Sequence, residues 1–242
     1  MIEAFFWGLG AAFSLIIGNW FAVYLKISRR MLGLIMAFGV GVLISAVSFE
    51  LIEEAFRSTN RASALALGLM AGSTTFFIGD LLIDHIGGRK HRITHSDTRN
   101  SGLAILLGTV LDGIPESIVI GLTLVKGGAV SVAMVIAVFL SNLPEAISAT
   151  TSLRASGWGR GRTLGLWAVV AILSGCAAWT GYAFFDNASP ETLAFTLAFA
   201  GGALLTMVAD SMMPEAYRDS GKLAGLITTF GFGLAYLISL AS

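Results

Sequence analysis

Long stretches of this sequence contain no charged residue, and this feature constrains the fold more than any other. Six uncharged runs of 18 to 23 residues cover positions 4–25, 31–49, 62–79, 163–185, 192–209 and 223–242. An α-helix rises about 1.5 Å per residue, so each run is long enough to cross a hydrocarbon core about 30 Å thick. The sequence therefore predicts an integral membrane protein built from helices.

Two further apolar stretches, 100–125 and 127–153, carry acidic residues inside them and bring the expected number of spans to eight. Only 12% of the 242 residues are charged, against roughly 25% in soluble domains. The 15 Lys and Arg are balanced by 15 Asp and Glu, so there is no basic excess to hold a nucleic acid. The single cysteine, Cys176, lies within a span, and we expect a buried apolar thiol.

The basic residues indicate the orientation of the chain. Twelve of the fifteen Lys and Arg fall in the alternate connections at 26–30, 89–99, 154–162 and 218–222, while the other connections contain only Arg57, Arg61 and Lys126. Cytoplasmic loops are enriched in Lys and Arg. We therefore expect both termini to lie on the extracytoplasmic side. The membrane itself is expected to be the cell membrane or an inner membrane.

One part of the sequence resembles another part of the same chain. Residues 37–56 align without gaps on residues 198–217 with seven identities, among them Glu54 with Glu215. If the copied unit is three helices, the second copy enters the membrane from the opposite side, as in many secondary transporters. The expected organisation is a single membrane domain with spans in a 3+2+3 arrangement. Its parts are 1–86 (first repeat), 87–99 (cytoplasmic loop), 100–154 (spans 4 and 5) and 162–242 (second repeat).

Spans 4 and 5 contain the same motif, a polar residue followed after two positions by Pro-Glu. Span 4 reads Asp-Gly-Ile-Pro-Glu and span 5 reads Ser-Asn-Leu-Pro-Glu. The first and fifth residues of each motif share a helix face, and proline loosens the carbonyl four positions before it. The candidate oxygen ligands are Asp112, Glu116, Ser141, Asn142 and Glu145.

Carboxylates near the middle of a membrane need compensating positive charge. An unpaired one costs at least about 2.5 kcal/mol on insertion scales, and no Lys or Arg lies inside any expected span. The charge is then supplied by protons or by a bound cation. Carboxylate, amide and hydroxyl oxygens together suit a divalent metal ion. The alternative is a pair of proline-kinked helices with protonated, mutually hydrogen-bonded carboxyl groups.

These motifs resemble those of the ZIP (Zrt/Irt-like) transporters of zinc and related divalent metals, whose spans 4 and 5 carry His-Asn-x-Pro-Glu-Gly. Here Pro115, Glu116, Asn142, Pro144 and Glu145 match that pattern. Asp112 and Ser141 stand at the two histidine positions, and Gly113 replaces an asparagine.

The resemblance implies an eight-span all-α fold with inverted three-helix repeats and outward termini. It also implies a metal site at these positions. The implied substrate is zinc, or manganese, iron or cadmium, with no separate cofactor. The implied surroundings are the lipid bilayer, and a homodimer is compatible with the family.

Other acidic and histidine residues are weaker candidates. Positions at the span ends that are candidates for a cation pathway are Glu50 and Glu54 on the outer side, and Asp80, Asp84, Asp210 and Glu215 on the cytoplasmic side. In the loop, His91 and His95 lie four residues apart and form a candidate metal relay. The alternative for these residues is ordinary solvation of helix ends and of a loop, and Asp80 and Asp210 lie deep enough to suggest an exit path.

The sequence favours a secondary transporter, in which the two repeats move around spans 4 and 5, over an enzyme. One alternative is an intramembrane hydrolase with Asp80 and Asp112 as paired carboxylates. The chain has neither His-Glu-x-x-His nor Gly-x-Ser-x-Gly, which are common hydrolase motifs. The other alternative, a membrane metal sensor that does not transport, leaves almost no soluble chain to carry a signal.

Overall fold

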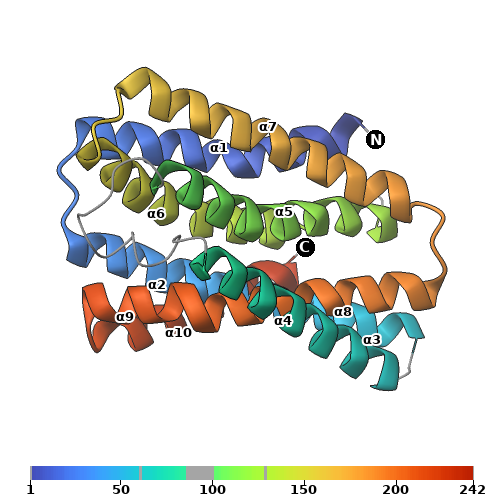
Figure 1. The fold of residues 1–242 in the computed structure, drawn as a ribbon. Helices are drawn as coiled ribbons and strands as arrows, with labels where there is room; N and C mark the ends of the chain where they lie inside the picture. Colours follow the sequence, from blue (N-terminus) through green and yellow to red (C-terminus); the bar gives the residue numbers. More distant parts are fainter. Residues whose placement is uncertain (1, 60–61, 86–100, 128–129, 242) are drawn as a thin grey trace.

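The computed structural model describes residues 2–59, 62–85, 101–127 and 130–241, and the helices run roughly parallel or antiparallel to one another (Figure 1). In chain order the helical elements are α1 (Ile2–Tyr24), α2 (Arg29–Ala46), η1 (Val47–Ile52), α3 (Glu53–Thr59), α4 (Ala62–His85), α5 (Ser101–Gly127), α6 (Val132–Ala155), α7 (Arg160–Phe185), α8 (Pro190–Met207), η3 (Val208–Met212), α9 (Met213–Ser220) and α10 (Leu223–Ala241).

Eight helices in the described part are long and apolar enough to cross a membrane. Two of them exceed the uncharged runs by more than ten residues. The spans Arg29–Thr59 and Pro190–Ser220 each contain 31 residues, because the helix continues through acidic residues after the uncharged run ends. The second and seventh spans therefore carry carboxylates on helical structure and not on loops.

The boundaries of these helices repeat with a constant offset. The helix ends at Tyr24 and Phe185 are 161 positions apart, and the same offset relates the helix starts Arg29 and Pro190, Val47 and Val208, and Ala62 and Leu223. In Figure 1, α2 and α8 run in opposite directions, as do α1 and α7. This pattern is that of a three-helix unit present twice, the second time inverted.

Local details of the two copies also correspond. Ser28 caps α2 by accepting a hydrogen bond from the Met31 N–H, and Ser189 caps α8 in the same way from Thr192. Each helix then changes to a π-helical segment, η1 or η3, at the same position of the repeat. Such segments are rare and frequently occur at functional sites. Here they lie where the acidic residues of spans 2 and 7 begin.

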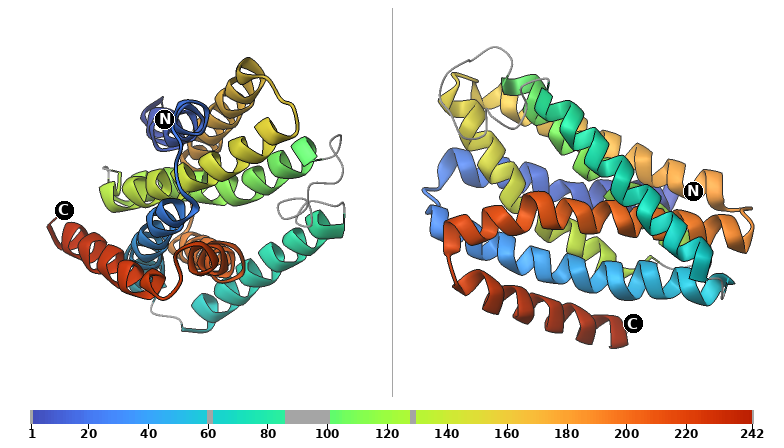
Figure 2. Two further views of the ribbon diagram at one scale, coloured as in Figure 1. Left: turned by 90° about the vertical axis from the view of Figure 1, so that its left-hand side faces the viewer. Right: turned by 60° about the horizontal axis from the view of Figure 1, so that its bottom comes forward.

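The helices pack in two groups, and each group takes members from both repeats. In the first group α1 packs against α6 and α7, and α5 packs against α7; in the second, α2 packs against α10, and α8 packs against α4. The end-on view in Figure 2 shows α5 and α6 between the α1 and α7 layer and the α2 and α8 layer. The groups meet where α6 contacts α2 and α5 contacts α8.

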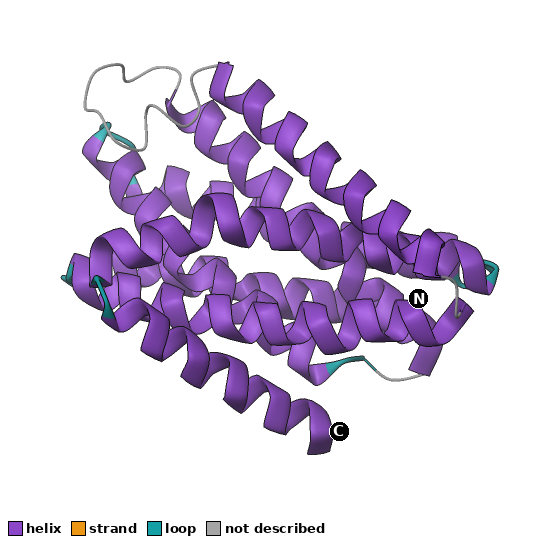
Figure 3. Ribbon diagram, turned by 90° about the horizontal axis from the view of Figure 1, so that it is seen from below, coloured by secondary structure: helices purple, strands orange, loops and turns teal. Residues whose placement is uncertain are grey.

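The prediction of an all-α membrane protein with eight spans is confirmed, and Figure 3 shows no strand among the described residues. The expectation for Cys176 is wrong. Its side chain is exposed on the outside of α7, so its apolar surroundings in a membrane are lipid and not protein. A span presents some residues to lipid, and apolarity alone does not distinguish these from core residues.

Glycines at equivalent positions allow the closest helix contacts. A Cβ at Gly41 would overlap the Thr228 carbonyl of α10, and a Cβ at Gly202 would overlap the Leu69 carbonyl of α4. We expect Gly41→Ala to destabilise the protein by about 1–3 kcal/mol, because backbone atoms must move apart. Gly10→Ala, with no described atom within 4 Å of its Cβ, serves as the control. Thermal unfolding in detergent measures both, and equal melting temperatures would contradict this packing.

Candidate functional site

The two Pro-Glu motifs meet in the middle of the helix layer formed by α5 and α6. The Ser141 hydroxyl of α6 donates a hydrogen bond to Glu116 Oε1 of α5 at 3.1 Å. Glu116 is 2% exposed and Ser141 is completely buried. A buried carboxylate is stable only with hydrogen-bonding or charged partners, so this contact fixes the register of the two motif faces.

The remaining motif residues extend the same region along both helices. Asn142 follows Ser141 and is 4% exposed, and Glu145 lies one helical turn beyond Ser141 with its side chain half-buried. Asp112 belongs to α5, one turn before Glu116, but its side chain lies outside the described part of the structure. The candidate metal-ligating groups that the structure describes are therefore two carboxylates, a hydroxyl and an amide.

The prolines of both motifs lie inside unbroken helices, Pro115 in α5 and Pro144 in α6. Because Pro144 has no N–H, the Leu140 carbonyl loses its usual helical donor. This carbonyl lies against Gly39 of α2, where an added Cβ would be 3.1 Å from the oxygen. Glycine at position 39 therefore lets α2 approach the loosened turn of α6 beside the motif.

The described side chains contain no group of three or more His, Cys, Asp or Glu that would hold a metal ion by themselves. The described side chains of the two motifs offer the carboxylates of Glu116 and Glu145 together with the neutral oxygens of Ser141 and Asn142. An oxygen-rich set of this kind suits hard divalent ions and still accommodates zinc.

A cavity of about 240 Å³ opens beside the second half of α6, at the end of the molecule where α2 begins. Its lining includes Ser148 and Ser152 of α6 and Asp210 of η3. Ser148 lies three residues after Glu145, about 4.5 Å further along the helix axis. The cavity therefore begins close to the end of the motif.

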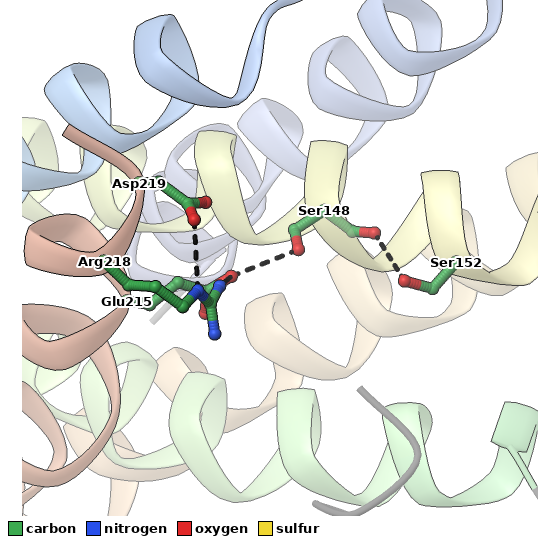
Figure 4. Close-up of polar contacts among 5 residues, drawn as sticks. All are labelled: Ser148, Ser152, Glu215, Arg218 and Asp219. Atoms are coloured by element: carbon green, nitrogen blue, oxygen red, sulfur yellow. Dashed lines mark hydrogen bonds and ion pairs between the residues drawn. The ribbon is translucent and has the colours of Figure 1, made fainter. Parts of the chain in front are cut away.

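Glu215 connects the cavity wall to α6. The Ser148 hydroxyl donates a hydrogen bond to Glu215 Oε1 at 3.3 Å, and Arg218 lies 3.3 Å from the same carboxylate (Figure 4). Arg218 also contacts Asp219 at 3.1 Å. The sequence offers Asp210 and Glu215 as span-end candidates for a cation pathway, and the structure brings both into one cavity. Sequence reasoning missed Ser148, Arg218 and Asp219.

The other acidic candidates lie in different places. Glu50 accepts a hydrogen bond from Ser239 of α10 at 2.6 Å, which directs its carboxylate toward an outer helix. Glu54 of α3 and Asp80 of α4 are half-buried. The side chain of Asp84, and His91 and His95 entirely, lie outside the described residues.

Together the fold and the central motifs define an eight-span, all-α membrane protein with a buried carboxylate at the contact of its two central helices. Over 188 residues the chain is 27% identical to the zinc transporter GufA of Myxococcus xanthus, covering 74% of this chain and 72% of that protein. No protein-family model matches the chain. The similarity to GufA confirms the likeness to the ZIP transporters that the Pro-Glu motifs indicate.

Proposed function

We propose that this protein transports divalent metal cations across a membrane through a site between α5 and α6. The observation that carries this proposal is the buried contact between Glu116 and Ser141, which joins the two repeated motifs. A carboxylate in a membrane span is a functional candidate by default because its burial is costly. The relative named as a zinc transporter supports transport and not hydrolysis.

The proposed ligands are Glu116, Glu145, Asn142 and Ser141, completed by Asp112. Zinc is the first candidate substrate because it is the metal in the relative's name. The absence of histidine from both motifs favours a broader range of transported metals, which includes manganese, iron and cadmium. We propose that the cavity beside Ser148, which begins one helical turn after Glu145, is part of the route between this site and the membrane surface where α2 begins.

The packing of the helices supports a particular kind of movement. Each three-helix repeat is divided between the two packed groups, since α1 lies in one group and α2 and α4 lie in the other. The sequence favours movement of the two repeats around spans 4 and 5, but this packing leads us to propose that alternating access arises from movement of one packed group against the other. Both motif helices travel with the first group.

The orientation proposed for this protein has the α6–α7 connection in the cytoplasm and the α7–α8 connection outside. In a Cys176→Ala background, single cysteines replacing Ala155 and Asn187, both exposed, are expected to react with an impermeant thiol reagent from opposite sides. Ala155→Cys should be protected in intact cells, and Asn187→Cys should be labelled. Labelling of both in intact cells would contradict this orientation.

Purified protein in liposomes tests the transport function directly. We expect saturable, protein-dependent uptake of zinc that manganese, iron and cadmium reduce in competition. A sensor or a hydrolase would give no uptake above that of protein-free liposomes. Uptake at the protein-free rate, with correctly folded and inserted protein, would contradict the proposal.

A further inference from the structure

The aligned segments of the internal repeat, 37–56 and 198–217, can each be extended by one residue. The added residue is an arginine in both copies. Glu-Ala-Phe-Arg at positions 54–57 corresponds to Glu-Ala-Tyr-Arg at positions 215–218, with the same offset of 161. Both sequences lie in the short helices that follow the π-helical segments, α3 and α9. Each long span therefore ends in a glutamate and an arginine one turn apart, at opposite ends of the molecule.

The two arginines have different partners, and the sequence explains the difference. Arg57 forms an ion pair with Glu53, in which both side chains are largely exposed. In the second copy Pro214 replaces Glu53, and Asp219 stands where the first copy has Ser58. Arg218 consequently pairs with Glu215 and Asp219.

This exchange places the second arginine in the cavity wall. Glu215 and Asp219 are mostly shielded, with 17% and 7% of their side chains exposed, and Arg218 lines the cavity with 51% exposed. The other charged groups of the lining are Arg29 and Asp210. The cavity thus contains three carboxylates and two guanidinium groups.

We propose that Arg218 is a resident counter-charge, which prevents the carboxylates of this cavity from retaining a metal ion that leaves the central site. This inference rests on the proposed transport function. The Arg218 guanidinium lies 3.3 Å from Glu215 and 3.1 Å from Asp219. A divalent cation in its place would meet both carboxylates, and opposite charges so close attract strongly where water is partly excluded. With Arg218 in place, a cation must compete with a tethered guanidinium for the same oxygens.

Arg218 lowers the affinity of the cavity for the metal ion. This role is distinct from ligation of the ion at the central site. Conduction requires a cation to bind well enough to enter and weakly enough to leave. A cavity with uncompensated carboxylates would hold the ion and slow its release. Arg57 performs no equivalent function, because it forms its ion pair with the exposed Glu53.

Manganese binding measured by electron paramagnetic resonance tests the proposal on the full chain in lipid nanodiscs. The central site is first disabled by Glu116→Gln with Glu145→Gln, so that only other sites contribute. In that background Arg218→Gln is expected to raise manganese affinity about two- to fivefold, the range that corresponds to the energies of exposed charge pairs. Adding Glu215→Gln should abolish the gain.

Matched variants distinguish the effect of the Arg218 charge on manganese affinity from an effect of altered packing. Arg57→Gln removes the equivalent arginine of the other copy and should change affinity less than about twofold, since its pair is exposed. Arg218→Lys keeps the charge and should behave as the parent. If Arg218→Gln does not fold, Arg218→Met provides the same test. Equal affinities for the parent and the charge-removing variant, or an equal gain with Arg57→Gln, would overturn the proposal. The binding comparison does not require transport, so a failure of the proposed function remains distinguishable.

Discussion

Glu116→Gln is expected to reduce saturable metal uptake into liposomes by about 100-fold or more while the protein remains folded and inserted. The amide has nearly the same volume as the carboxylate, and Ser141 can still donate its hydrogen bond to the amide oxygen. The substitution removes the negative charge and one strong ligand, and metal sites lose about 10–100-fold even from weaker changes around their ligands.

Glu145→Gln should produce a loss of similar size, because both motifs are proposed to contribute a carboxylate to one site. Glu191→Gln, an exposed residue in the first turn of α8, should retain parental uptake and serves as the control for loss of one negative charge. Size-exclusion chromatography and thermal unfolding check that each variant is folded. Parental uptake by both motif variants would exclude the α5–α6 site.

The second large effect concerns metal selectivity. Asp112→His combined with Ser141→His introduces two imidazoles, which suit zinc better than manganese. We expect the ratio of zinc to manganese affinity to rise by about tenfold. Zinc binding should also weaken as the pH falls through about 6.5, because the protonated imidazole no longer coordinates metal.

Competition uptake at pH 7.5 and pH 5.5 measures both changes. The double variant Asp112→Glu with Ser141→Thr keeps oxygen ligands at the same positions, so its zinc to manganese ratio should remain near that of the parent. If the histidine variant has an unchanged ratio and an unchanged pH dependence, these positions do not contact the ion.

The sequence predicts most of the fold because a membrane imposes simple rules. Uncharged runs of sufficient length identify the spans, and the gapless match of 37–56 with 198–217 indicates the repeat that the helix boundaries display throughout. The prediction misplaced the ends of spans 2 and 7, because a charged residue ends an uncharged run but does not end a helix. It also misplaced Cys176, since periodicity is weak when all faces of a helix are apolar.

The candidate site was only partly predictable for a physical reason. Spacing within one helix shows that Ser141 and Glu145 share a face, but the contact of Ser141 with Glu116 depends on how two helices pack. The contact of Ser148 with Glu215 joins residues 67 positions apart, so local sequence patterns do not predict it. Only the extension of the repeat to Arg57 and Arg218 offered a signal for the cavity arginine.

Anomalous diffraction from crystals grown with manganese or zinc tests the central claim most directly. We predict a peak between α5 and α6, about 2.0–2.2 Å from carboxylate oxygens of Glu116 and Glu145, that disappears in the Glu116→Gln variant. A fully occupied peak elsewhere, with no density between the two motifs, would contradict the assignment of the transport site to α5 and α6.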